Sequence, residues 1–194
     1  QSQPSSARAL QGEALAWKRR EAMRELIQRD PAQALALAAP FHWRHTLPPN
    51  VTRHFERWVD ARGDYEVAMA DGGGGGPDTV YRWAVLDGER FTAFVYGRRT
   101  AQISHWQIPL HGIALDGMIA LLADPIRVLQ TDEATFRERD LPGQRVCHVC
   151  GQPLRAPSRK IAGDVGGETA LFCSNEHLEL VNARWVLNES GGPA

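Results

Sequence analysis

The chain has no excess of either charge and no long apolar run. It carries 22 Lys and Arg against 23 Asp and Glu in 194 residues, so the formal net charge is −1. Such a balance does not draw a protein toward nucleic acid or an anionic membrane. No apolar run approaches the roughly 18 residues of a membrane-spanning helix. We therefore expect neither nucleic-acid binding nor membrane insertion.

The sequence also lacks the spacings that identify common catalytic sites. It has no HExxH pattern, and no Ser/His/Asp set or paired carboxylates stand at a readable spacing. His42 and His45 lie three residues apart, as two ligands on a helix would, but no acidic residue follows at general-base spacing. We expect no enzymatic activity, no catalytic residues and no organic cofactor. The alternative is a metal-dependent hydrolase with an unrecognised site, either an open metal site or the group of His42, His45, His54 and His111.

Cysteine is scarce, yet all three cysteines fall in one C-terminal pattern. Two residues separate Cys147 from Cys150, and after 22 more residues Cys173 and His177 follow with three residues between them. Two close ligand pairs joined by a moderate loop suit tetrahedral Zn²⁺, which imposes little geometry beyond four-coordination. The pattern predicts a closed structural zinc site of Cys147, Cys150, Cys173 and His177. A disulfide from Cys173 to Cys147 or Cys150 with one spare thiol, or three inert thiols, are the alternatives.

The first 40 residues favour helices. Residues 7–29 are rich in Ala, Leu, Glu and Arg, with apolar side chains at helical spacing. Asp30 and Pro31 predict a second helix, because Asp30 suits the N-cap and Pro31 the first helical position. Residues 41–62 predict a loop and a short helix that carries Val51, Phe55 and Val59.

From Gly63 onward the apolar residues alternate, which predicts strands. Residues 71–77 predict a flexible hairpin tip, and residues 79–96 predict a hairpin whose two-residue turn is Asp87-Gly88. Residues 101–129 hold short apolar runs broken by Pro and Gly, which predicts several short strands in a small sheet or barrel. A short capped helix is expected over residues 131–139. Arg98, Arg99, His105 and Trp106 predict a solvated rim, with a ligand-binding surface as the alternative.

Several segments of the chain carry a resemblance to a known family: LIQRDPAQALALA (26–38), RGDYEV (62–67), FTAFVYGRR (91–99) and IPLHGIALDGMIALLADPIRVL (108–129). They resemble the N-terminal region that precedes large secreted multidomain proteins of some bacteria. The resemblance covers residues 13–186 and implies a recurring accessory domain without a known activity. Where that family has a serine in its C-terminal element, this chain has Cys150, which makes a fourth ligand available.

The C-terminal segment carries a second resemblance. CHVCG, LFCSNEH and LELVNARWVL are similar to the treble-clef zinc modules of the TRASH and MYM type. That resemblance implies zinc binding, heavy-metal sensing or protein contacts, with His177 in place of the last cysteine. Gly151 permits the tight turn after Cys150, and Ser174 suits the cap of a helix whose first turn presents His177. The apolar side chains expected to pack this helix are Leu178, Leu180, Val181, Trp185 and Val186.

Together these patterns predict an α+β protein in two units. Residues 1–140 would form N-terminal helices packed on a small antiparallel sheet or barrel, and residues 141–190 a zinc-ribbon or treble-clef module. The expected function is that of a noncatalytic accessory domain of an exported bacterial protein, with a folding, inhibitory or protein-contact role and a structural zinc. Its partner would be another protein or downstream domains of the same polypeptide. An exchangeable metal-handling or sensing protein is the other alternative.

The first residues of the chain indicate in which cellular compartment the protein is expected. QSQPSSARAL has no apolar core of a signal peptide, and the chain begins at Gln1 without an initiating Met. A polar start of this kind suits a segment just after a signal cleavage site. We therefore expect a secreted or periplasmic protein, with a cytoplasmic location as the alternative.

Overall fold

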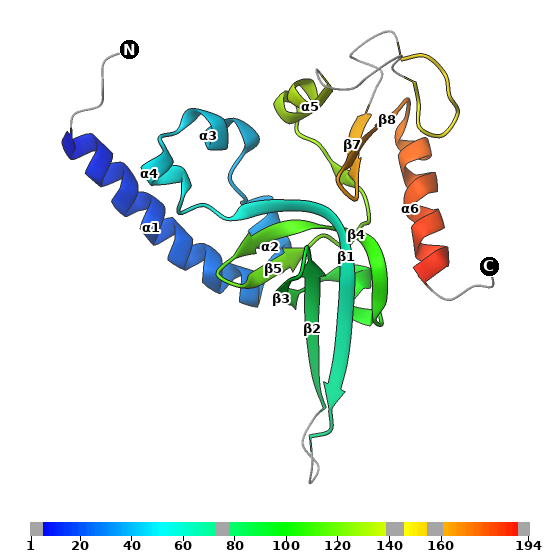
Figure 1. Cartoon of the computed structure of the whole chain (residues 1–194), viewed down its shortest axis with the longest axis horizontal. Helices are drawn as coiled ribbons and strands as arrows, with labels where there is room; N and C mark the ends of the chain where they lie inside the picture. Colours follow the sequence, from blue (N-terminus) through cyan, green and yellow to red (C-terminus); the bar gives the residue numbers. More distant parts are fainter. Residues whose placement is uncertain (1–5, 73–77, 139–145, 155–160, 190–194) are drawn as a thin grey trace.

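The computed structural model describes residues 6–72, 78–138, 146–154 and 161–189 (Figure 1). Its helices are α1 (Ser6–Arg29), α2 (Pro31–Ala36), α3 (Phe41–Thr46), α4 (Pro49–Thr52), the 3-10 helix η1 (Gly97–Ala101), α5 (Thr131–Glu138) and α6 (Asn175–Glu189). Its strands are β1 (Arg57–Ala70), β2 (Thr79–Leu86), β3 (Glu89–Phe94), β4 (His105–Leu115), β5 (Met118–Leu121), β6 (Arg127–Val128), β7 (Ile161–Val165) and β8 (Glu168–Phe172). The predicted mixture of helices and strands is confirmed.

Five strands form a closed barrel in the order β1-β2-β3-β5-β4. Neighbouring strands are antiparallel except β3 and β5, which run parallel, and β1 pairs with β4 to close the barrel. This order, with its single parallel pair, is that of the five-stranded Greek-key barrel known as the OB-fold. Its interior is a continuous core of apolar side chains from all five strands, including Val59, Ala84, Phe91, Leu110 and Ile119. The predicted barrel is thus present, although it is not wholly antiparallel.

Two Asp-Gly turns set the register of the barrel. Asp87 and Gly88, between β2 and β3, have φ of 50° and 81°, and Asp116 and Gly117, between β4 and β5, have φ of 51° and 73°. Two successive residues with positive φ are what a type I′ turn requires, and its twist matches that of the flanking strands. The hairpin predicted at Asp87-Gly88 is confirmed.

The barrel overturns two expectations about where strands begin and end. Residues 57–62 are strand rather than helix, because Val59 is a core residue of β1 and the segment pairs with β4. Likewise β4 runs unbroken through Pro109 and Gly112, where the sequence indicated separate short strands. Pro109 is tolerated because β5 pairs with β4 only from Gly112 onward, so the strand has a free edge at the proline.

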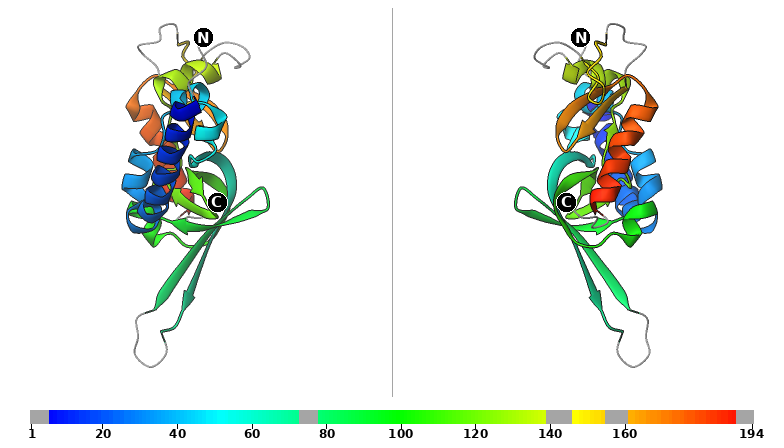
Figure 2. Two further views of the ribbon diagram at one scale, coloured as in Figure 1. Left: turned by 90° about the vertical axis from the view of Figure 1, so that its left-hand side faces the viewer. Right: turned by 90° about the vertical axis from the view of Figure 1, so that its right-hand side faces the viewer.

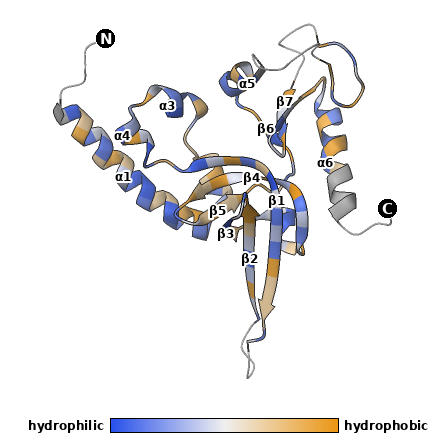
Figure 3. Cartoon of the chain, viewed as in Figure 1, coloured by the Kyte–Doolittle hydropathy of each residue, from blue (hydrophilic) through white to orange (hydrophobic). Residues whose placement is uncertain are grey.

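The N-terminal helices pack on the barrel as predicted. Ile27 of α1 and Ala34 of α2 are fully buried in a core shared with Ile113 of β4 and Ala120 of β5. The Asp30 side chain accepts a hydrogen bond of 3.0 Å from the Gln33 amide, which is the predicted N-cap. Hydrophilic and hydrophobic residues are interspersed along α1 (Figure 3), because only one side of it faces the barrel.

Beyond the barrel, β1 and β2 continue as a two-stranded ribbon that projects from the body (Figures 1 and 2). The tip was predicted to be a flexible loop, but residues 73–77 lie outside the described residues. No helix in the described part of the chain is both long and apolar enough to cross a membrane.

The C-terminal region contains a three-stranded antiparallel sheet in the order β6-β7-β8, followed by α6. One small core there contains Ile126, Phe172 and Leu178, with Val181 packed against it, and a second contains Leu129, Ala162 and Leu171. Leu180 is 52% exposed, so the prediction that it packs inward was wrong. The side chains of Trp185 and Val186 lie outside the described ones. β6 is a strand of this sheet, and Arg137 of α5 forms an ion pair with Asp164 of β7, although both β6 and α5 precede residue 141.

Candidate metal centre

The structure brings the four predicted ligands together. One ligand atom from each of Cys147, Cys150, Cys173 and His177 lies within 4.8 Å of all the others. The His177 Nδ1 atom is 3.4 Å from Cys147 Sγ and 3.1 Å from Cys173 Sγ, and the Cys150 and Cys173 sulfurs are 3.9 Å apart. Zn–S bonds of about 2.3 Å in a tetrahedron place two sulfurs about 3.8 Å apart and a sulfur and a nitrogen about 3.5 Å apart. These three separations are close to those of a tetrahedral metal site.

The first ligand pair lies on a tight turn. Gly151 donates its amide to the Cys147 carbonyl at 2.9 Å, and Cys147 donates to the Gln152 carbonyl at 2.9 Å. Gly151 has φ of 70°, a conformation that residues with a Cβ rarely adopt, so the expected role of this glycine is confirmed. The His148 amide donates to Leu171 of β8, which holds the turn against the sheet.

The second pair lies at the junction of β8 and α6. Cys173 follows the last residue of β8, and His177 stands in the first turn of α6. The Ser174 hydroxyl accepts a hydrogen bond of 3.3 Å from the His177 amide, as expected of an N-cap. The helix start therefore fixes where the imidazole points.

The cluster is poorly suited to holding several thiolates without a cation. Burial alone would raise the pKa of Cys147, but donation from the Cys150 and Cys173 amides lowers it to about 6. Partial burial and the sulfurs of Cys147 and Cys150 raise the pKa of Cys173 to about 11. A second thiolate beside the first is unfavourable unless a bound cation compensates their repulsion. All three cysteines are free thiols in this structure.

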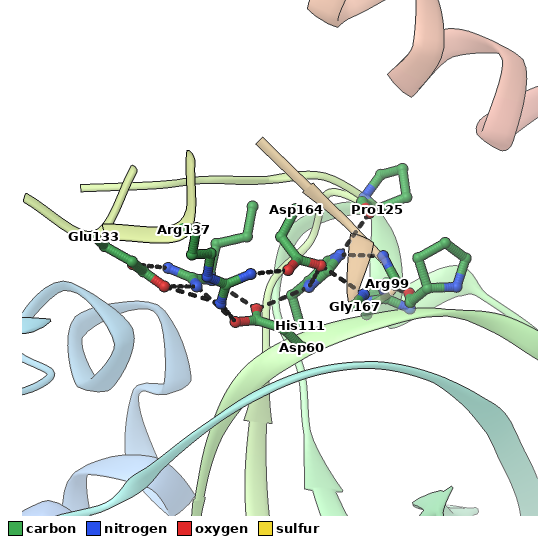
Figure 4. Close-up of polar contacts among 11 residues, drawn as sticks. Asp60, Arg99, His111, Pro125, Glu133, Arg137, Asp164 and Gly167 are labelled. Atoms are coloured by element: carbon green, nitrogen blue, oxygen red, sulfur yellow. Dashed lines mark hydrogen bonds and ion pairs between the residues drawn. The ribbon is translucent and has the colours of Figure 1, made fainter. Parts of the chain in front are cut away.

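A second cluster, which sequence reasoning did not find, joins the barrel to the C-terminal sheet (Figure 4). Asp60 of β1 accepts hydrogen bonds from Arg127 at 2.6 Å and from Arg137 at 2.8 Å. Arg127 also binds Glu133 of α5 at 2.6 and 2.9 Å, and Arg137 binds Asp164 of β7. The carboxylates come from three elements that are distant in sequence. No local pattern could have revealed them.

His111 completes this ionic junction. It is fully buried, with Nδ1 3.0 Å from Asp60 Oδ1 and Nε2 2.9 Å from the Pro125 carbonyl. Asp60, His111 and Asp164 are close enough to hold a metal ion, but guanidinium groups already bind both carboxylates. Three carboxylates facing two guanidiniums and an imidazole form a structural network, since buried charges persist only when they are paired.

The other histidines are not assembled into a site. His45 packs against Phe41 and Phe136, and His54 packs edge-on against Trp17. Among the described residues, neither these two nor His42 belongs to a group of three or more potential metal ligands. The arrangement that a hydrolase of His42, His45, His54 and His111 would need is therefore not formed.

The segment expected to be a solvated rim is exposed only in part. Arg99 is only 2% exposed and donates to the Leu122 carbonyl, and His105 is half-buried at the start of β4. Arg98 and Trp106 fit the expectation, since Arg98 is exposed and Trp106 is 69% exposed. The rim prediction was wrong for Arg99 because η1 turns this residue toward the end of the barrel.

Two buried carboxylates link the stability of the fold to pH. Burial opposes ionisation of both, but hydrogen bonds from His111 and Arg127 lower the pKa of Asp60, and those from Arg19 lower the pKa of Glu56. Groups whose pKa is depressed on folding contribute stability above their unfolded pKa of about 4 and lose it as the pH falls toward the folded value.

We expect the free energy of unfolding to decrease as the pH falls below about 4. Each of the two carboxylates adds a slope of up to about 1.4 kcal/mol per pH unit, because the unfolded chain takes up protons that the folded protein does not. Denaturant unfolding between pH 7 and 3 measures the slope. The Asp60→Asn variant should show a smaller slope. Because both proteins would lose metal in acid, the difference between their slopes reports on Asp60 alone. An equal slope in both proteins would contradict the assignment to Asp60.

Neither a family model, nor a curated protein, nor a solved structure matches this chain. Its function therefore has to be inferred from its own residues and their geometry.

Proposed function

We propose that the protein is a noncatalytic, zinc-stabilised protein-contact module. The observation that carries the proposal is the Cys3His cluster, whose four ligand atoms lie within 4.8 Å of one another. Three thiolates and an imidazole are a donor set that suits Zn²⁺. Four protein ligands complete a tetrahedron, so no position remains for a water that could attack a substrate.

The order of the elements around the cluster supports a treble-clef arrangement. A turn carries Cys147 and Cys150, the β7–β8 hairpin follows, and the first turn of α6 presents His177. In such an arrangement the ion joins the turn to the helix. The small apolar core of the C-terminal sheet needs this support, because few side chains are buried there.

Exposed apolar side chains on the N-terminal helices support a role in protein contact. Leu10 and Trp17 are seven residues apart on α1 and are 69% and 51% exposed, and Trp43 of α3 is also exposed. A spacing of seven residues places Leu10 and Trp17 on the same side of α1, and large exposed apolar groups on one helix face are typical of surfaces that bind another protein. A partner protein or a further domain of the same polypeptide fits this surface.

Metal content and thiol titration test the proposal. Elemental mass spectrometry on protein purified without chelator or added metal should find about one zinc per chain. The three thiols should react only after the metal is removed by denaturation in chelator, because bound thiolates are protected.

Other outcomes would favour other functions. If a chelator of moderate affinity removes the zinc while the protein stays folded, the function would be exchangeable metal handling. The solvent exposure of Cys150 favours that outcome. Absence of metal together with a single reactive thiol would indicate a disulfide, and it would overturn the zinc proposal.

A further inference from the structure

The end of the barrel beneath η1 collects polar side chains on its inner face. Tyr65 of β1 is fully buried and pairs with Ala84 of β2 and, beyond a bulge, with His105 of β4. Paired residues point to the same side of a sheet, and side chains alternate along each strand. His105 and Arg82, which lies two residues before Ala84, therefore share the inner face with Tyr65.

The 3-10 helix η1 and the residue after it cover this end. Arg99 is buried and donates to the Pro109 carbonyl at 3.4 Å and to the Gln102 side-chain oxygen at 2.9 Å. Its guanidinium lies 5.9 Å from the centre of the Tyr65 ring. Arg82 donates to the Thr100 carbonyl at 2.7 Å. Two guanidiniums and an imidazole thus meet in the barrel-end cluster, which consists of Tyr65, Arg82, Arg99, Gln102 and His105.

Three polar atoms of the barrel-end cluster are buried without a hydrogen-bond partner among the described residues. They are Arg82 Nε, Gln102 Nε2 and His105 Nε2. The first two are obligate donors, and the third donates in one of its tautomers. Buried donors are almost always paired in folded proteins, so an unsatisfied set of three indicates a ligand or ordered water that accepts from them.

The charge of the barrel-end cluster favours an anion over water. In the described part of the chain Arg82 and His105 form no ion pair with a carboxylate, whereas most other arginines of the barrel do. A water molecule accepts only about two hydrogen bonds and leaves the charge of Arg82 uncompensated, while an oxyanion accepts from several donors at once. The Tyr65 hydroxyl already donates to the Arg99 carbonyl at 3.4 Å, so the donors left for a ligand are those of Arg82, Gln102 and His105.

We propose that the barrel-end cluster binds a small oxyanion of the phosphate class. Arg82, Gln102 and His105 would donate to its oxygens from three different elements, β2, the segment after η1, and β4. All three residues are only partly buried, so the anion can enter from solvent. The site is separate from the Cys3His cluster, and its occupation does not depend on zinc.

Inorganic phosphate is the first probe, added to the intact chain as purified. We expect saturable one-site binding by calorimetry and a rise of about 3–8 °C in the melting temperature at saturation. Sodium chloride at matched ionic strength should produce neither effect. A phosphomonoester that binds at least about tenfold more tightly would indicate that the natural ligand is a phosphorylated metabolite, and equal affinity would indicate the free ion.

Two variants and one control decide the proposal. Arg82→Gln removes a charge and a donor, and Gln102→Glu places a carboxylate in the site while keeping an acceptor for Arg99. Both should weaken phosphate binding at least about tenfold, and Gln102→Glu should raise the melting temperature without phosphate. Arg90→Gln, which changes an exposed arginine paired with Glu66, should leave phosphate binding unchanged.

Circular dichroism and zinc content establish that each variant is folded before binding is measured. If the Arg82→Gln variant does not fold, phosphate binding by the Gln102→Glu variant tests the proposal by itself. An unchanged phosphate response in the folded variants, or equal stabilisation by chloride, would mean that ordinary water satisfies these donors, and the proposal would be overturned.

Discussion

Replacing Cys173 with serine is expected to remove zinc from the protein and to unfold the C-terminal sheet and α6. The Cys173 sulfur lies next to both Cys150 and His177, so its loss opens the centre of the cluster. Structural zinc binding contributes roughly 10–16 kcal/mol of apparent free energy to small zinc modules. The apolar core of this region cannot replace that contribution, because it consists of two small clusters of buried side chains: Ile126, Ala170, Phe172 and Leu178, and Leu129, Ala162 and Leu171.

The loss should be confined to one part of the chain. The barrel has its own core, centred on Tyr65, Leu110 and Ile119, so it should remain folded when the C-terminal sheet does not. Elemental analysis and hydrogen exchange over residues 161–189 and 57–121 measure the two parts separately. We expect zinc to fall from about one per chain to nearly none, and exchange protection to be lost only in the first segment.

His148→Gln is the matched control for this experiment. His148 lies between the first two cysteines, is exposed and does not belong to the ligand cluster. It should retain zinc and exchange protection. A Cys173→Ser protein that kept both zinc and protection would show that the cluster does not hold the region together.

The second large effect is expected from Arg127→Met, which removes the central cation of the ionic junction. Arg127 is 4% exposed, binds Asp60 and Glu133 with two bonds each, and stacks 4.6 Å from the Trp58 ring. The substitution leaves two buried carboxylates short of a partner. Breaking a buried ion pair from one side costs about 3–5 kcal/mol, and we expect a loss of that size in the free energy of unfolding.

Two further variants test whether the loss of stability comes from unpaired buried charge: one removes an exposed ion pair, and the other removes a second charge from the ionic junction. Arg57→Met, at the start of β1, breaks an exposed pair with Glu89 at 3.4 Å and should change stability by less than about 1 kcal/mol. Adding Asp60→Asn to Arg127→Met should recover part of the loss, because one unpaired charge disappears. Equal effects of Arg127→Met and Arg57→Met in denaturant unfolding would contradict a buried, mutually dependent network.

Local signals in the sequence predicted the parts of the protein that form within a few residues. The N-cap at Asp30 and the type I′ turn at Asp87-Gly88 depend on backbone conformations that those residues adopt intrinsically. The ligand set of the metal centre was predictable for the same reason. A tight turn and a helix start each present two ligands at fixed spacing, and the sequence shows both at Cys147 and His177.

Pairing between segments that are distant in the sequence determined the secondary structure of residues whose local pattern was ambiguous. Whether residues 57–62 become helix or strand depends on whether β4 is available beside them, and no local propensity records that. The same holds for Pro109, which is compatible with a strand because no strand pairs with that edge of β4 there.

The sequence by itself therefore determined the capped helices, the Asp-Gly turns and the four residues of the Cys3His cluster. Closure of the barrel, the ionic junction around Asp60 and the inward position of Arg99 were decided only by the tertiary structure. Asp60, Arg127 and Asp164 are far apart in the chain, and their charges are stable in the interior only when all of them meet. Such mutual dependence is a property of the folded arrangement, and no single segment contains it.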